Sequence, residues 1–153
     1  MGPPARLQMQ FTTLLPSTSR RWLRLLFARI PDFDITPAGV VPLILVGRAG
    51  GGIAQIALAE QLGVVEPSLV RTLARLDEQG LLRREPDPND RRVRTLWLTD
   101  VGEAMVEGLE KRLVEIRAEL FEGISTDDLK AALRVHEALV DRLALLAPIR
   151  PGS

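Results

Sequence analysis

The chain of 153 residues contains no cysteine. This absence excludes disulfide bonds, redox sensing by a thiolate and zinc sites with cysteine ligands. Because the chain also has a single histidine, His136, a metal site built from histidines is not expected either. The sequence therefore predicts a protein without a bound metal or cofactor.

The sequence also lacks an excess of charge of either sign, since it has 20 basic and 20 acidic residues. Overall charge thus gives no indication of nucleic acid, whose phosphates dominate its affinity for proteins. A basic surface would have to come from the placement of side chains rather than from composition. All basic residues except Lys111 and Lys130 are arginine, which suits planar hydrogen bonding to guanine and phosphate.

Long hydrophobic runs are absent as well. The most apolar segment, Ala38 to Val46, is too short to span a bilayer and contains Gly39 and Pro42. The N-terminus has no signal-peptide pattern, so we expect a cytoplasmic protein. A hydrophobic content of 46% with 26% charged residues, at this length, predicts one globular structural unit with a substantial core.

The most informative segment runs from Glu66 to Thr99 and begins with a predicted helix over about residues 67–79. Pro67 is suited to a first helical turn, and Gly80 can stop the helix in a left-handed conformation. Four apolar residues at helical spacing predict an inward stripe: Leu69, Val70, Leu73 and Leu76. The opposite face carries hydrogen-bond donors: Ser68, Arg71, Thr72 and Arg75.

A two-stranded hairpin, over about residues 81–98, is predicted to follow this helix. Its strands are residues 81–85 and 93–98, joined by a loop that contains Asp90, Arg91 and Arg92. A helix with a donor-rich outer face fits the major groove of DNA, where it can contact base edges. An arginine on a protruding loop can enter a narrow minor groove. The segment is therefore predicted to bind DNA.

At these residues the sequence resembles the MarR/SlyA family of winged-helix transcription regulators. The matching segments are Pro67 to Leu73, Gly80-Leu81-Leu82, Asp87 to Arg92, and Leu98-Thr99 with Gly102. The resemblance covers roughly residues 18–147, with the specific motifs in residues 66–102. It implies a mainly α fold with a small β wing, in which a winged helix-turn-helix lobe accompanies N- and C-terminal helices that form a dimerisation region.

The resemblance also implies function. Such proteins are homodimers that bind palindromic DNA operators, commonly as repressors, and lose DNA affinity when a small aromatic or phenolic acid binds. An arginine of the wing, Arg92 by analogy, enters the minor groove while Asp90 orients it. The predicted DNA-binding residues are Ser68, Arg71, Thr72, Arg75, Asp90, Arg91, Arg92 and Arg94. Trp22, Arg24 and Pro42 are candidates for the ligand site, with ordinary core or dimer packing as the alternative for Trp22.

The regions outside the segment 66–99 divide as follows. Residues 1–17 are predicted to form an N-terminal arm that docks on another surface, such as a partner subunit, or is a flexible tail. Ser17-Thr18-Ser19 caps a helix that ends before Pro31.

Residues 36–99 are predicted to form the winged helix-turn-helix lobe. In it, a helix starting at Pro37 is kinked or interrupted by Pro42. Gly50 to Gly52 is a flexible connector, since no Gly-Lys-Ser/Thr follows for a phosphate loop. A short helix then covers residues 53–62.

Residues 18–35 and 100–147 are predicted to form the helical dimerisation region. Thr99 caps a long helix, and Ser125 begins a capping box for the last one. The long helix has an apolar seam: Val101, Met105, Leu109, Leu113, Ile116, Leu120 and Ile124. The last helix has a stripe on which His136 is interpreted as a packed residue. Two such helices have more apolar surface than one subunit can cover.

The sequence also bears on two other classes of function. Catalysis is not expected, because there is no cysteine, the one histidine lies on an apolar stripe, and no carboxylate pair is placed in a cleft. A winged-helix module that binds another protein, or a regulator without ligand response, stays an alternative. The arginines at 71, 75, 91 and 92 disfavour a protein-binding module, whereas Trp97, predicted to lie opposite Leu96 and Leu98, has no clear role.

Overall fold

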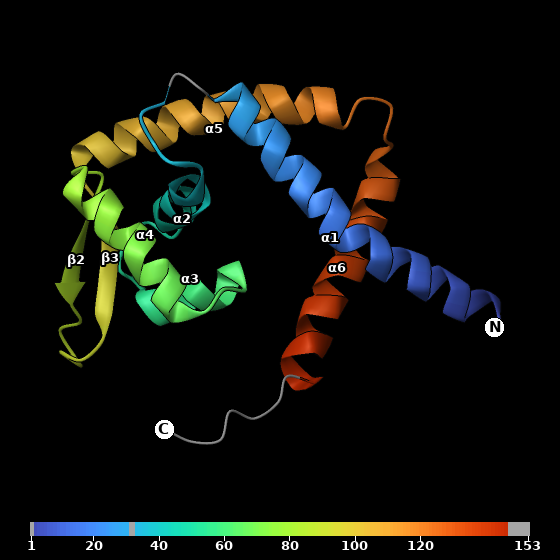
Figure 1. The fold of residues 1–153 in the computed structure, drawn as a ribbon, viewed down its shortest axis with the longest axis horizontal. Coiled ribbons are helices and arrows are strands. Elements are labelled where there is room, and N and C mark those ends of the chain that lie inside the picture. Colours follow the sequence, from blue (N-terminus) through green and yellow to red (C-terminus); the bar gives the residue numbers. More distant parts are fainter. Residues whose placement is uncertain (1, 31–32, 147–153) are drawn as a thin grey trace. The chain divides into compact units, whose positions relative to one another are not determined.

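The computed structural model describes residues 2–30 and 33–146. The chain divides into two compact units, Met1–Ile116 and Arg117–Ser153. The elements follow in the order α1 (Pro3–Arg29), α2 (Pro37–Arg48), β1 (Ile53–Ala54), α3 (Gln55–Leu62), α4 (Glu66–Glu78), β2 (Leu82–Pro86), β3 (Arg94–Leu98), α5 (Asp100–Leu120) and α6 (Thr126–Leu146) (Figure 1).

The first unit contains a three-stranded antiparallel sheet in the order β1-β3-β2. In the β2–β3 hairpin Leu82 pairs with Leu98 and Pro86 with Arg94, as the predicted hairpin requires. The third strand was not predicted: Ile53 and Ala54 pair with β3, so the helix expected over 53–62 begins at Gln55. A mainly helical chain with a small antiparallel wing confirms the predicted fold class.

The hydrophobic core of the first unit lies between the helices and the sheet. Its fully buried side chains come from α1, α2, α3, α4, both strands of the hairpin and α5; the largest are Leu26, Leu43, Leu58, Leu73, Leu76, Leu82, Leu96, Leu109, Leu113 and Ile116. Burial of each leucine-sized side chain stabilises the fold by about 1.5–3 kcal/mol. This core holds α4 and the hairpin as one rigid surface.

Helix α1 differs from its prediction at the N-terminal end. It begins at Pro3 and passes through Pro16, so the predicted cap at residues 17–19 is wrong, and residues 3–17 of the predicted arm belong to the same helix as residues 18–29. The Ser17 hydroxyl instead donates to the Leu14 carbonyl, and Thr13 donates to Met9, bonds that occur within a continuing helix. The helix ends at Arg29, as predicted, while Pro31 and Asp32 lie outside the described residues.

Helix α2 settles the question of Pro42, because the helix continues from Pro37 to Arg48 with Pro42 buried inside it. Thr36 occupies the predicted N-cap position without a side-chain hydrogen bond. The following glycine segment is packed rather than a free connector. A Cβ atom on Gly51 would overlap the ring of Trp97, and one on Gly52 would lie 3.1 Å from it.

Trp97 thus covers the glycine segment and is only partly exposed. Its indole Nε1–H donates to the Thr95 hydroxyl at 3.1 Å, and the Arg83 guanidinium lies 5.8 Å from the ring centroid. An aromatic ring with a satisfied N–H and a cation over its face is a structural contact of the sheet. The position of Trp97 on the sheet is therefore explained by contacts within the chain and does not require a protein partner.

Both predicted caps of the long helices are confirmed. The Thr99 hydroxyl accepts the Gly102 N–H at 3.0 Å at the start of α5, and the Ser125 hydroxyl accepts the Asp128 N–H at 3.1 Å before α6. The predicted seam of α5 is shorter than expected, since the helix ends at Leu120 and Ile124 lies beyond it. At the other end of the seam, Val101 is exposed.

Within the single chain, α6 has no buried residue among those that the structure describes. The interpretation of His136 as a packed residue is therefore wrong for the isolated chain, in which His136 is exposed. The predicted last residue of this region, Ala147, and the prolines beyond it lie outside the described residues.

Candidate nucleic-acid interface

Helix α4 is fixed in place by one apolar side. Leu69, Leu73 and Leu76 are buried, with 3% or less of each exposed. Pro67 lies in the first turn, and Gly80, with φ of +69°, follows the C-cap, so both predicted ends of the helix are confirmed to within a residue. Val70 does not belong to the inward stripe, because its side chain is 39% exposed. That part of the prediction is wrong.

The outer side of α4 carries the four donor side chains that the sequence indicated. Ser68, Arg71 and Arg75 are exposed, and Thr72 is half-buried. All four line one open groove of about 460 Å³ that also touches Thr36, Ala38 and Pro67. The groove lies beside the N-terminal turn of α2. The structure therefore brings the helical part of the predicted site together on a single accessible face.

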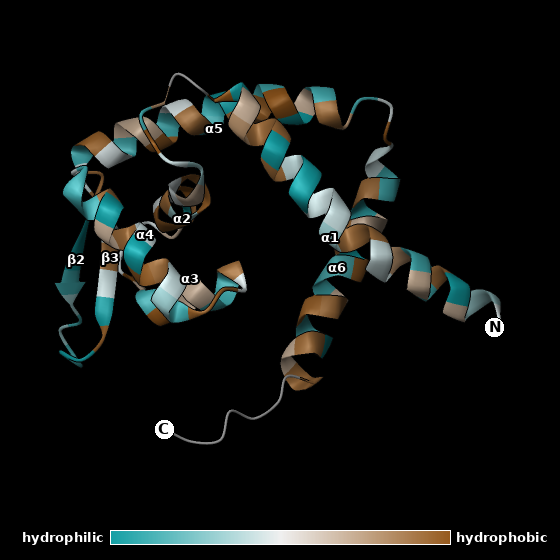
Figure 2. Cartoon of the chain, in the orientation of Figure 1, coloured by the Kyte–Doolittle hydropathy of each residue, from teal (hydrophilic) through white to brown (hydrophobic). Residues whose placement is uncertain are grey.

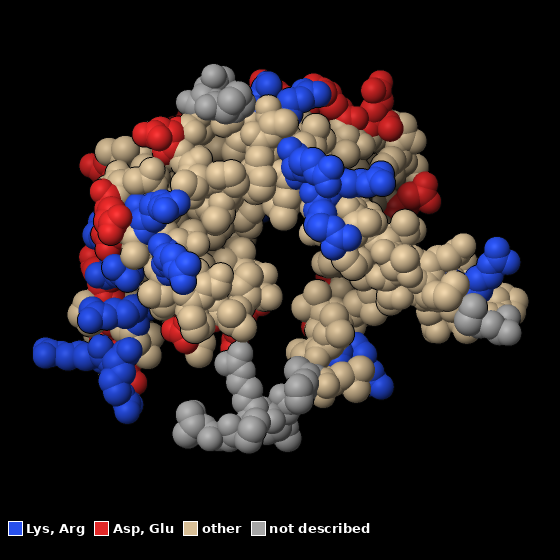
Figure 3. Space-filling view, viewed as in Figure 1, with Lys and Arg blue, Asp and Glu red and all other residues tan. Residues whose placement is uncertain are grey.

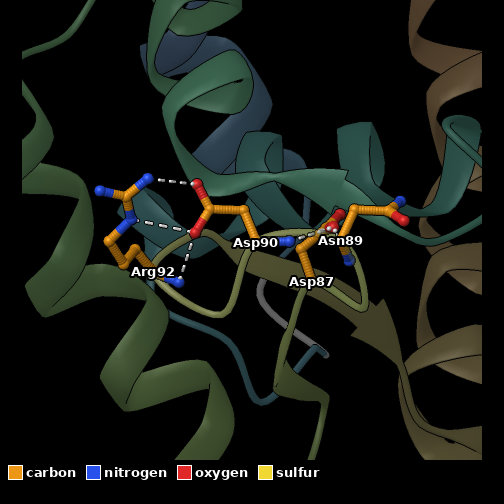
Figure 4. A network of polar contacts seen from close by, with 4 residues as sticks. All are labelled: Asp87, Asn89, Asp90 and Arg92. Carbon is orange, nitrogen blue, oxygen red and sulfur yellow. Dashed lines mark hydrogen bonds and ion pairs between the residues drawn. The ribbon is translucent and has the colours of Figure 1, made fainter.

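The tip of the hairpin is ordered by two aspartates. The Asp87 carboxylate accepts the backbone N–H groups of Asn89 at 2.7 Å and Asp90 at 3.2 Å (Figure 4). The Asp90 carboxylate in turn accepts the Arg92 backbone N–H at 3.0 Å and, through both oxygens, the Nε and Nη2 of Arg92 at 3.1 Å each. The wing loop is thus built around an Asp90–Arg92 fork.

The fork shifts the pKa of both partners. The Arg92 guanidinium and its backbone N–H lower the pKa of Asp90, and the same carboxylate raises the pKa of Arg92. Since the Arg92 side chain is 91% exposed, the pair is screened by water and contributes little to stability. Its effect is geometric: the carboxylate holds an exposed, fully charged guanidinium in a fixed position at the end of the wing.

Arg91 and Arg94 complete the predicted set and are both exposed. Arg94, at the start of β3, lines a hollow with Asp77 and Arg84, so it lies nearer to α4 than the loop arginines do. In the face shown, basic side chains gather over α4 and at the end of the hairpin (Figure 3). This placement supplies the positive surface that the composition did not.

Acidic residues near this surface are held by neighbouring side chains. Asp77 accepts the Arg84 Nε at 3.1 Å, Glu85 accepts the Arg83 Nε at 2.6 Å, and Glu66 accepts the Gln55 amide at 3.1 Å. Glu78 is exposed at the last turn of α4. Most of the acidic side chains of residues 66–99 therefore accept hydrogen bonds from neighbouring groups, and Arg71 and Arg75 lie on the outer face of the helix.

A second cavity, of about 360 Å³, lies between α1, α2 and the start of α4. Its lining is largely apolar: Leu23, Phe27, Pro37, Ala38, Val41, Pro42, Leu62, Val64, Ser68, Leu69 and Thr72. Of the three residues predicted for a ligand site, Pro42 lines this cavity. Trp22 packs against the hydrophobic core and Arg24 is exposed, and neither lines the cavity.

Residues 2–30 and 33–146 contain no group of three or more His, Cys, Asp or Glu side chains arranged to hold a metal ion. No helix in this described part combines the length and hydropathy that a bilayer span requires.

Comparison with known proteins agrees with the fold. A model of the MarR family matches residues 33–93. The transcriptional regulator PA3341 is 29% identical, with a TM-score of 0.80 over 88% of this chain and 98% of that one. A MarR variant from E. coli, solved in complex with operator DNA, is 26% identical, with a TM-score of 0.74 over 85% of this chain and 93% of that one.

A further similar structure is the transcriptional repressor CouR, bound to a 23-mer DNA duplex. It is 26% identical, with a TM-score of 0.73 over 91% of this chain and 98% of its own. Neither the family model nor these structures indicates an enzyme. The family model over residues 33–93 and the structural likeness over most of the chain together show that this protein is similar in sequence and fold to the MarR family of winged-helix transcription regulators.

Proposed function

We propose that the protein is a sequence-specific transcription repressor that binds a palindromic DNA operator as a homodimer. The observation that carries the proposal is the arrangement of Arg71 and Ser68 on the accessible side of α4 together with the Asp90–Arg92 fork of the wing. Arginine and hydroxyl donors on a helix face suit base edges and phosphates in the major groove.

The roles of the individual residues follow from their positions. Arg71 and Ser68 contact bases or phosphate, Thr72 supports them at the edge of the groove, and Arg75 contacts phosphate. Arg92, positioned by Asp90, enters the minor groove, with Arg91 and Arg94 on the flanking phosphates. Two-fold symmetry places two α4 helices in successive major grooves, about 34 Å apart.

The homodimer is supported by apolar side chains that the single chain leaves uncovered. Along α6, Leu133, Val140 and Leu143 are each more than half exposed, and hydrophobic residues recur along this helix (Figure 2). The N-terminal half of α1 also exposes Leu7 and Leu14. Exposed apolar surface along a helix marks an interface with another polypeptide, and a second copy is the partner that symmetric operators require.

The proposed effector is a small aromatic or phenolic acid. The apolar cavity beside α2 has the size of small-molecule sites and is lined by Ser68 and Thr72 of α4. A ligand there would contact the DNA-binding helix directly, so it could favour one position of the helix over another. Salicylate is a suitable probe: it should weaken operator binding, and Val41→Trp, which fills the cavity, should abolish that effect.

The test is fluorescence anisotropy of the purified protein on duplexes that tile the DNA upstream of its gene. A scrambled duplex is the control, and the salt concentration is varied. We expect nanomolar affinity for one palindrome, a large specificity ratio and a steep salt dependence. Arg71→Ala should remove most of the specificity, whereas Arg134→Ala, which removes an exposed arginine of α6, should not.

Equal micromolar binding to every duplex would contradict the proposal. It would favour the alternative of a winged-helix module that binds another protein. An operator complex that no aromatic acid weakens would instead favour a regulator without ligand response.

A further inference from the structure

Val70 occupies an unusual position for a β-branched apolar residue. It lies in the middle of α4 and is 39% exposed, whereas the other large apolar side chains of this helix, Leu69, Leu73 and Leu76, are buried. Valine has a lower helix propensity than alanine or leucine because the preceding turn restricts its χ1 angle. Val70 therefore costs helical stability and gains less from burial than the neighbouring leucines do.

The surroundings of Val70 make its side chain accessible. Pro67 and Ala74, at i−3 and i+4, are small neighbours on the same side of the helix. The longer acidic residues of that side are tied elsewhere, Glu66 to Gln55 and Asp77 to Arg84. Val70 thus forms an apolar strip with Pro67 and Ala74 that runs beside the exposed Arg71.

This strip continues the face that we propose enters the major groove. Base pairs present hydrogen-bond donors and acceptors there, and the thymine C5-methyl group is the apolar feature. An apolar side chain placed against a polar base edge would leave that edge desolvated without a partner, which is costly. A valine methyl against a thymine methyl carries no such cost and buries apolar area on both partners.

We infer that Val70 contacts the C5-methyl group of a thymine in the operator and so determines specificity at one base pair. The inference rests on the proposed operator binding, and it assigns to α4 an apolar contact beside the polar contacts of Arg71. The operator half-site accordingly requires thymine at one position for its methyl group rather than for its hydrogen-bonding groups.

The test replaces each thymine of the selected operator, one at a time, by deoxyuridine, which removes only the methyl group. Anisotropy is measured at fixed salt for the wild type, Val70→Ala and the matched control Val101→Ala, an exposed valine in the first turn of α5. For the wild type and Val101→Ala, one replacement per half-site should weaken binding by about fourfold, as expected for a methyl-sized group.

Val70→Ala should bind the thymine operator more weakly than the wild type, and the same deoxyuridine replacement should have no further effect on it. Because Val70 is not a core residue, circular dichroism and thermal unfolding should report an intact fold. Wild-type binding that no replacement changes, or an equal loss for the wild type and Val70→Ala, would overturn the inference and leave the proposed function intact. Equal affinity for operator and scrambled duplexes would overturn both.

Discussion

The carbonyl oxygen of Leu81 occupies the space in which a Cβ atom on Gly102 would lie. The first turn of α5 is therefore in backbone contact with the turn that follows α4. The Thr99 N–H donates to the same Leu81 carbonyl at 3.2 Å, and the Thr99 hydroxyl donates to Gly80. This contact ties the start of α5 to the C-terminal end of the proposed recognition helix.

We predict that Gly102→Ala destabilises the protein by about 2–4 kcal/mol, because the backbone rather than a movable side chain must give way. The free energy of unfolding is measured by urea denaturation at fixed protein concentration. Val101→Ala, at the adjacent exposed position, should change it by less than about 0.5 kcal/mol. Equal stability of the two variants would mean that α5 can shift away from Leu81 without loss.

The Trp97 ring gives a second packing prediction. Gly51→Ala should cost about 1–3 kcal/mol more than Gly50→Ala in the free energy of unfolding. Both glycines have positive φ, but a Cβ on Gly51 would meet the Trp97 ring, whereas one on Gly50 meets nothing within 4 Å. The pair of variants separates ring contact from backbone strain. If both lost the same stability, the glycine segment would be constrained by its backbone alone.

For the wing, Arg92→Ala should weaken operator binding by about 1–3 kcal/mol. Asp90→Asn should weaken it less, because the guanidinium remains but is no longer held through two charge-assisted hydrogen bonds. Anisotropy at constant salt measures both effects, with Arg134→Ala as the control. Unchanged affinity of Arg92→Ala would remove the wing from the mechanism.

The Asp90–Arg92 fork also predicts a pH effect. Because Arg92 lowers the pKa of Asp90 in the folded protein, the contribution of the fork to the order of the wing is complete above the ordinary aspartate pKa of about 3.9. It is lost as the pH falls through the lowered value. In Arg92→Gln the pKa of Asp90 should rise toward the ordinary value. Carboxyl ¹³C NMR titration measures this, and an unmoved pKa would mean that other groups set it.

Leu143→Asp should convert the proposed homodimer into monomers. Leu143 is 65% exposed in the single chain. If the partner subunit covers Leu143, the free energy of dimer formation becomes less favourable by about 3–6 kcal/mol. Each of the two copies loses the burial of one leucine side chain, which is worth about 1.5–3 kcal/mol. Size-exclusion chromatography with light scattering reports the mass. Arg142→Asp, which adds the same side chain at the neighbouring position, should stay dimeric; two dimeric variants would place the interface elsewhere.

The sequence alone determined the elements whose signals are local. The proposed recognition helix, expected over 67–79, is α4 at Glu66–Glu78, and the hairpin and the caps at Thr99 and Ser125 lie where they were expected. Helical periodicity, a proline in the first turn, a glycine after the last and a hydroxyl before an acidic turn act over a few residues. The same locality gave the donor residues of α4, whereas the role of Asp90 was implied by the family resemblance.

Tertiary structure decided what depends on distant partners. Ile53 and Ala54 form a strand because Leu96 and Thr95 lie beside them, and two residues are too few to carry a strand pattern of their own. Trp97 is held by Gly51 and Arg83, which no alternation along β3 could indicate. Val70 is exposed because the side of α4 that packs against the core is narrower than the apolar stripe that its sequence predicts. In each case the deciding contact joins segments whose proximity is set by the folded core rather than by neighbours in the chain.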